Sequence, residues 1–99
     1  MANYYLSNRA VEDLSKIWDY TYEVWLELQA EKYYFMLLDV CQDIADGRIS
    51  GKPYTEINSE ILGVKAGRHI IFYRKAKRVG IEVSRILHSR MDLKKWIEE

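Results

Sequence analysis

The apolar residues of this chain change their spacing part-way along it, and this change constrains the fold more than any other feature. Between residues 11 and 45 they recur every three or four positions, which is typical of helices with one apolar face. Between residues 69 and 88, β-branched and aromatic residues form two runs separated by a basic turn, which predicts two hairpin strands. We therefore expect an α+β fold in which helices pack on one face of an antiparallel sheet.

Two helices are predicted in the first half of the chain. Ser7 or Asn8 can cap the first helix, because either side chain can accept a hydrogen bond from an amide of the first turn. A second pattern runs over residues 34–45 and stops at Gly47, a favourable residue for a left-handed helix end. The expected break lies near residues 26–29 without glycine or proline, so one long bent helix is the alternative to a helical hairpin. The apolar face of the first helix comprises Val11, Leu14, Trp18, Tyr22 and Trp25.

The remaining elements are predicted from shorter sequence patterns. Gly80 is expected to ease a bulge near the start of the last strand. One or two helical turns are expected at the end of the chain, within residues 91–99. The whole fits a single domain over residues 1–99. The other predicted elements are a short strand at residues 4–6, a loop at 48–58, a weak strand at 61–64 and strong strands at 69–75 and 79–88.

The formal net charge of zero hides two halves of opposite sign. Residues 1–46 contain three basic and nine acidic side chains, whereas residues 47–99 contain twelve basic and six acidic ones. A chain polarised in this way can present a cationic surface to one partner while another partner covers the rest.

Several classes of protein are disfavoured by composition. No run approaches the roughly 20 apolar residues of a membrane span, and the first residues do not resemble a signal peptide. The single cysteine, Cys41, suits a reducing compartment, so we expect a cytoplasmic protein. Two histidines and a distant cysteine give no metal-ligand spacing, so neither a metal nor a cofactor is expected.

A cluster of basic and aromatic residues at the strand ends is the candidate chemical site. It could be no more than the solvated rim of a sheet. Alternatively, its arginines could neutralise a phosphate while a histidine moves a proton, as in metal-free ribonucleases. The same cations could instead contact an acidic protein or a nucleic acid backbone. The cluster comprises Arg68, His69, Tyr73, Arg74, Arg85 and His88.

The aromatic residues of the first helix allow two interpretations. Trp18, Tyr22 and Trp25 lie at helical spacing, and packing in the core is the simpler explanation. The chain has many aromatic residues for one small core, so part of the stripe could stay exposed as a groove for a partner helix.

Two groups of motifs extend over almost the whole chain. The helical half contains Tyr5-Leu6-Ser7-x-x-Ala10-x-x-Asp13-Leu14, Ile17-Trp18-x-Tyr20-Thr21 and Gln29-Ala30-x-x-Tyr33. The other half contains Gly67-x-His69-x-Ile71-Phe72-Tyr73-Arg74 and then the most specific motif, Arg85-Ile86-Leu87-His88-x-x-Met91-Asp92. Together these motifs resemble the ParE toxins. Leu26 departs from the pattern, since ParE sequences often have glycine there, and the corner between the helices is expected to be less sharp.

The resemblance implies the RelE/ParE toxin fold and a role in a type II toxin–antitoxin pair with a ParD-like antitoxin. ParE toxins arrest growth by inhibiting DNA gyrase, and such pairs stabilise plasmids. Relatives in the RelE branch cut mRNA on the ribosome, and they often have a tyrosine or a His-Tyr pair near the end of the last strand. His88 is followed by no tyrosine here, which favours gyrase inhibition by a non-enzymatic toxin over cleavage. A degenerate toxin that only binds an antitoxin is a third possibility.

These hypotheses assign residues to three roles, and no sequence-specific binding to nucleic acid is expected. A ribonuclease would use Arg74, Arg85 and His88. The surface for an antitoxin would include Trp18, Tyr22, Trp25 and Tyr34. The surface for gyrase would comprise Arg68, Arg74, Arg85, His88, Arg90, Lys94, Lys95 and Trp96.

Overall fold

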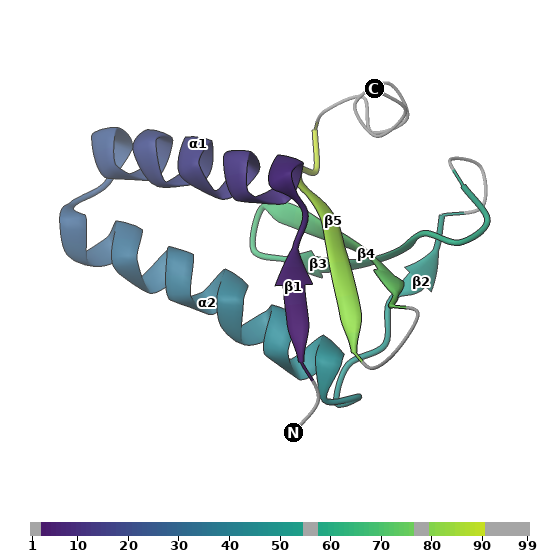
Figure 1. The fold of residues 1–99 in the computed structure, drawn as a ribbon. Helices are drawn as coiled ribbons and strands as arrows, with labels where there is room; N and C mark the ends of the chain where they lie inside the picture. Colours follow the sequence, from purple (N-terminus) through teal and green to yellow (C-terminus); the bar gives the residue numbers. More distant parts are fainter. Residues whose placement is uncertain (1–2, 55–57, 77–79, 91–99) are drawn as a thin grey trace.

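Two helices lie on one face of a five-stranded sheet (Figure 1). The computed structural model describes residues 3–54, 58–76 and 80–90. The predicted α+β class is confirmed, and so is the helical hairpin. The predicted C-terminal helix lies outside the described residues. The elements are β1 (Tyr4–Leu6), α1 (Asn8–Val24), α2 (Glu27–Ala45), β2 (Lys52–Pro53), β3 (Leu62–Ala66), β4 (His69–Lys75) and β5 (Ile81–His88).

The sheet is mixed rather than purely antiparallel. Its strand order is β1-β5-β4-β3-β2, and β1 pairs in parallel with β5 at one edge. The other neighbouring strands are antiparallel. At the opposite edge β2 is a two-residue strand within the segment that was predicted to be a loop.

The junction between β1 and α1 depends on Ser7. Its backbone is extended, and its hydroxyl oxygen accepts a hydrogen bond from the Ala10 amide at 3.1 Å, which caps the helix as predicted. The same hydroxyl donates to the Ser84 carbonyl of β5 at 2.7 Å. One side chain therefore starts the helix and ties it to the sheet edge where β1 ends.

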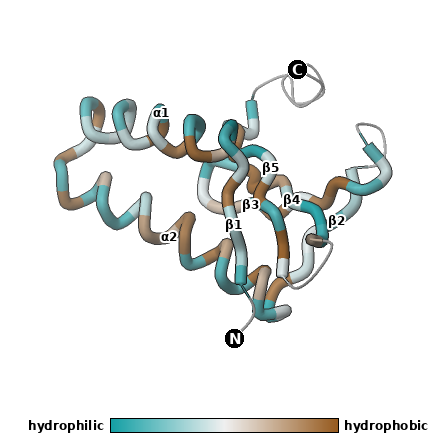
Figure 2. The backbone as a smooth tube through the Cα atoms, viewed as in Figure 1, coloured by the Kyte–Doolittle hydropathy of each residue, from teal (hydrophilic) through white to brown (hydrophobic). Residues whose placement is uncertain are grey.

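The two helices meet at a corner without glycine. Trp25 and Leu26 both adopt extended backbone angles, with ψ near 168° and 153°, and these two residues reverse the chain direction. The corner is hydrophobic in Figure 2, and the side chains of Val24, Leu26 and Leu28 are more than half exposed. The break thus begins one residue earlier than the predicted range.

The buried face of α1 differs from the predicted aromatic stripe. The residues that pack toward the sheet are Ala10, Leu14, Ile17 and Thr21, whereas Val11 and Tyr22 are each 51% exposed. The Thr21 hydroxyl is satisfied because it donates to the Ile17 carbonyl at 2.8 Å. A small polar residue with an internal hydrogen bond therefore occupies a core position, and the larger aromatic residues point elsewhere.

A bulge in β5 changes which of its residues face the helices. Tyr73 pairs with Val83 and Phe72 with Arg85, so Ser84 is the extra residue. Val83 and Ile86 consequently share the helix-facing core, which strict alternation would forbid. The expectation that Gly80 sits at the bulge is wrong.

Gly80 has a different role, in the connection between β4 and β5. It adopts a φ of +91°, and a Cβ atom there would collide with the backbone of Asn3. Glycine thus allows the chain just before β1 to lie against the start of β5.

Alternating residues of β4 supply two hydrophobic cores, one on each face of the sheet. Ile71 and Tyr73 join the larger core beneath the helices. Ile70 and Phe72 join a smaller core with Ile61 and Leu87, against which Tyr54 packs. Burial on both faces fixes the register of β4 against β5, and this register brings two histidines together.

Candidate functional site

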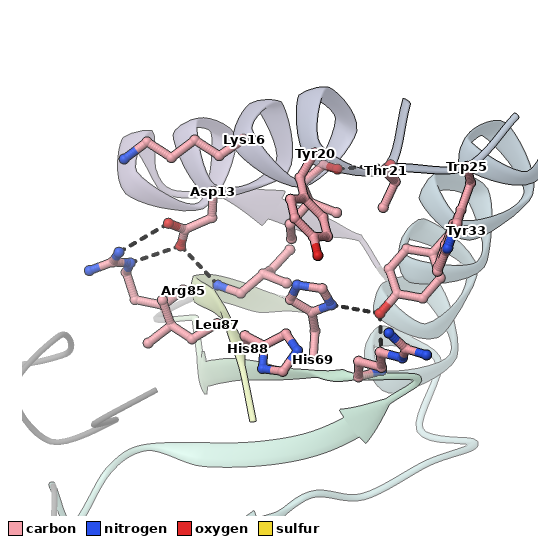
Figure 3. A pocket seen from close by; sticks show the side chains of 13 residues that line it. Asp13, Lys16, Tyr20, Thr21, Trp25, Tyr33, His69, Arg85, Leu87 and His88 are labelled. Carbon is pink, nitrogen blue, oxygen red and sulfur yellow. Dashed lines mark hydrogen bonds and ion pairs between the residues drawn. The ribbon is translucent and has the colours of Figure 1, made fainter. Parts of the chain in front are cut away.

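A cavity of about 420 Å³ opens between α1, the helical corner and the adjoining ends of β4 and β5. Figure 3 shows Tyr20 extending from α1 toward the sheet, with His69 and His88 below it. The size lies within the range of small-ligand sites. The lining residues are Asp13, Lys16, Ile17, Tyr20, Thr21, Trp25, Tyr33, Arg68, His69, Arg85, Ile86, Leu87 and His88.

Two histidines occupy the floor of this cavity. His69 begins β4 and pairs directly with His88 at the end of β5, and their ring centroids are 5.3 Å apart. The Tyr33 hydroxyl accepts a hydrogen bond from the Arg68 amide at 3.0 Å and lies 2.6 Å from Nδ1 of His69. Since the hydroxyl has no other acceptor among the residues that the structure describes, we assign its proton to Nδ1, and neutral His69 then has its own proton on Nε2.

The tautomer of His88 is constrained in a similar way. The backbone amide of Arg90 donates to Nδ1 of His88 at 3.1 Å. A neutral His88 ring therefore also has its proton on Nε2. Both rings leave an N–H donor for an acceptor outside these two hydrogen bonds.

Burial and, to a smaller extent, the neighbouring His88 lower the pKa of His69 to about 4, while Asp13 opposes the shift. His69 is consequently neutral near pH 7. The His69–Tyr33 hydrogen bond is consistent with this state, because an Nδ1 lone pair must be free to accept.

The lowered His69 pKa predicts a loss of stability in mild acid. From its ordinary value of 6.5 down to about 4, the unfolded chain binds a proton at this ring that the folded chain does not. The free energy of unfolding should fall over that window by less than about 1 kcal/mol per pH unit, because water partly screens the ring. Urea unfolding of the wild type and His69→Gln between pH 7 and pH 4 measures this component. The glutamine keeps an acceptor for Tyr33, and identical pH profiles for the two proteins would contradict the prediction.

Arg85 does not present a free charge to the cavity. Its Nε lies 2.8 Å from Oδ2 of Asp13 and a terminal nitrogen lies 3.0 Å from Oδ1 (Figure 3). The same carboxylate accepts the Ile86 amide at 3.0 Å. Asp13 therefore neutralises the arginine and also completes the hydrogen bonding of β5 beyond the end of β1.

A separate groove lies between α1 and α2. Trp18 contacts Tyr22 and Tyr34, with ring centroids 6.1 and 5.7 Å away, and Tyr34 contacts Phe35 at 5.6 Å. Trp18, Tyr34 and Phe35 line this groove together with Leu6, Val11, Leu14, Ser15 and Glu31. Phe35 is 58% exposed, so an apolar surface remains open to a partner.

The sequence matches a known family over residues 4–93, and that family is described as the ParE toxin of the type II toxin–antitoxin system parDE. The chain belongs to the ParE toxin family. It is 37% identical over 92 residues to Toxin ParE1 of Mycobacterium tuberculosis (strain CDC 1551 / Oshkosh), covering 93% of this chain and 94% of that protein. It is 35% identical to Toxin ParE1 of Caulobacter vibrioides, with the same coverage.

The fold is also similar to that of a solved structure. A structure of the chromosomal ParDE TA system from P. aeruginosa superposes with a TM-score of 0.74 at 17% identity, covering 89% of this chain and 96% of that one. Membership in the ParE toxin family agrees with the prediction of a toxin that acts without catalysis. Neither described helix combines the length and apolar character of a membrane crossing.

The structure separates the three residues that were predicted for a RelE-like ribonuclease. Arg85 and His88 line the cavity, but Arg74 pairs with Glu82 at 3.6 Å toward the other end of β4. Arg74 lies five positions along the strand from His69, with four residues between them, a span of roughly 16 Å. The guanidinium of Arg85 is also held by Asp13. The arrangement thus gives no support to phosphate cleavage by this trio.

The residues predicted for the two binding surfaces are also divided. Arg68 and His88 line the cavity. Arg90 lies two residues after His88 in the chain, and its backbone amide donates to His88. Trp25 lines the cavity and contacts Tyr33, with ring centroids 5.4 Å apart, so it is separate from the groove of Trp18 and Tyr34. Lys94, Lys95 and Trp96 lie outside the described residues.

Sequence reasoning overlooked several residues of the ParE cavity. Tyr33 and Asp13 occur in the motifs that resemble the family, yet no role was assigned to them. The signal for Asp13 was available, because an acidic residue on the buried face of a helix needs a partner. Lys16 and Tyr20 show no distinctive spacing, and only the fold places them over the histidines. Among the residues that the structure describes, no group of three or more potential ligands gathers for a metal ion.

Proposed function

We propose that this chain is the toxin of a ParDE-like pair, that it inhibits DNA gyrase by direct binding in the cytoplasm, and that a ParD-like antitoxin neutralises it. The single observation that supports this most is the ParE family match over residues 4–93. The relatives named Toxin ParE1 support it further, since the chain aligns with 94% of their length.

The charge distribution supports a cationic target surface near the cavity. Arg68 is exposed, and no carboxylate among residues 3–54, 58–76 and 80–90 pairs with it. Arg90 is exposed beside His88. These three residues form the described part of the proposed gyrase surface, and Lys94, Lys95 and Trp96 follow directly in the sequence. Arg85 contributes to it by holding β5 against α1, and Arg74 lies too far along the sheet to belong to the same patch.

The groove between α1 and α2 supports a separate antitoxin surface. Trp18, Tyr34 and Phe35 offer aromatic area between two helices, a shape suited to an apolar helix face of a partner. Tyr22 extends this surface through its contact with Trp18. Trp25 would belong to this antitoxin surface only if the antitoxin extended past the helical corner.

A supercoiling assay tests the gyrase proposal. The purified toxin should depress negative supercoiling by gyrase at near-stoichiometric ratios. The double variant Arg68→Glu/Arg90→Glu should need at least about tenfold more protein, because reversing two cations replaces attraction with repulsion. Arg48→Glu is the matched control, since Arg48 is exposed at the end of α2 and away from the cavity.

Two outcomes would contradict the proposal. Supercoiling that persists in a large excess of toxin would remove gyrase as the target. Normal growth after induced expression would instead indicate a degenerate toxin retained for antitoxin binding.

A further inference from the structure

The cavity has properties that protein–protein recognition by charged surfaces does not require. Its walls include the aromatic rings of Trp25, Tyr33 and Tyr20, which come from the helical corner, α2 and α1. Tyr33 is held in place by its hydrogen bonds to His69 and to the Arg68 amide. Tyr20 is 63% exposed and extends toward the histidines (Figure 3). Aromatic side chains arranged in this way suit stacking against a planar ring.

The floor of the cavity presents hydrogen-bond donors rather than acceptors. Tyr33 and the Arg90 amide occupy Nδ1 of His69 and His88 respectively, so the Nε2–H group of each ring remains available. With the tautomers assigned from these Nδ1 partners, the two donors lie on rings whose centroids are 5.3 Å apart, close enough to serve one acceptor group.

The charge around the cavity is positive. Asp13 is the one carboxylate in its lining, and Arg85 already neutralises it. Lys16 and Arg68 also line the cavity, and neither pairs with a carboxylate in the part of the chain that the structure describes. Arg68 also lies 6.0 Å from the centre of the Trp25 ring, so a cation and an aromatic wall are adjacent.

We propose that this cavity binds a small aromatic anion, about the size of a nucleoside monophosphate, whose ring lies against Trp25, Tyr33 and Tyr20 and whose anionic group accepts from Nε2 of His69 and His88 near Arg68. Nucleotides and aromatic carboxylates share this chemistry. The inference does not require gyrase binding, because it rests on the cavity, although Arg68 and His88 belong to both proposed surfaces.

An NMR titration of the full chain tests the proposal through the imidazole resonances of His69 and His88. Adenosine monophosphate and indole-3-acetate are the two anionic aromatic probes, and the tighter of the two identifies the source of the ligand. Adenosine, which has no charge, and inorganic phosphate, which has no ring, should each bind at least about tenfold more weakly than the better probe, since each lacks one set of contacts.

Arg68→Gln should weaken binding of the better probe by about tenfold, the usual effect of losing one charge-assisted contact. It leaves the backbone amide that holds Tyr33. Arg48→Gln removes an exposed cation outside the cavity and should change the affinity less than about twofold. Histidine resonances that do not respond to either aromatic anion, or an Arg68→Gln variant that binds like the wild type, would overturn the proposal. Equal responses to phosphate and to both aromatic anions would also overturn it, because the rings would then contribute nothing.

Discussion

Replacing Asp13 by alanine is expected to lower the free energy of unfolding by about 3–5 kcal/mol, the usual cost of removing one partner of a buried ion pair. The carboxylate is only 8% exposed and the Arg85 side chain 12% exposed, so water cannot replace what is lost. The Ile86 amide would lose its acceptor at the same time. Both defects fall at the point where β5 has passed the end of β1.

Urea unfolding followed by circular dichroism measures this effect, and Asp43→Ala is the control. Asp43 pairs with Arg48 at 3.5 Å, but the Arg48 side chain is 73% exposed, so that loss should stay below about 1 kcal/mol. Asp13→Asn keeps an oxygen for the Ile86 amide and should cost less than alanine. If both alanine variants were equally stable, the Asp13–Arg85 pair would not stabilise the junction of α1 and β5.

The helices and the strong strands were predictable because their signals are local. The spacing of apolar residues identified both helices and therefore the helical hairpin, and β-branched residues identified β4 and β5. The parallel pairing of β1 with β5 could not be predicted, because Tyr4 and Ile81 are far apart in the sequence and three residues give little pattern. The bulge at Ser84 was missed because a polar residue between apolar ones looks like ordinary alternation.

The candidate site was only partly predictable for the same reason. His69 and His88 were both in the predicted cluster, and the hairpin register brings them together. Their partners are remote, since Tyr33 and Asp13 lie on different helices. Because the pairing of Asp13 with Arg85 could not be predicted, Arg85 was interpreted as a free cation. Arg74 was assigned to the same site as His88, but Arg74 pairs with Glu82 and His88 pairs with His69, at the opposite end of the two strands.

The aromatic residues of α1 show why hydrophobicity alone misidentified the buried face. Trp18 and Tyr22 have more apolar area than Ala10 or Thr21, yet the smaller residues face the sheet. Small side chains let the helix approach β5 closely, as its contacts through Ser7 and Asp13 require. Trp18 then lines the groove proposed for the antitoxin, and Tyr22 contacts Trp18 beside it.

Phe35→Glu and Trp18→Glu are expected to weaken antitoxin binding by about 100-fold, a typical effect for an aromatic residue at the centre of an interface. Each change places a charge in the groove, where an apolar helix face of the antitoxin would desolvate it. Phe35 is 58% exposed, so its replacement should leave the fold of the free toxin intact.

Calorimetric titration with a ParD-like antitoxin measures both variants, and Tyr20→Glu is the matched control. Tyr20 is an exposed aromatic residue of the same helix that lines the cavity instead of the groove, so its change should alter the affinity less than about threefold. Trp25→Glu tests whether the antitoxin extends past the helical corner. If Phe35→Glu bound as tightly as the wild type while Tyr20→Glu or Trp25→Glu did not, the antitoxin would lie over the histidine cavity and would compete there with gyrase.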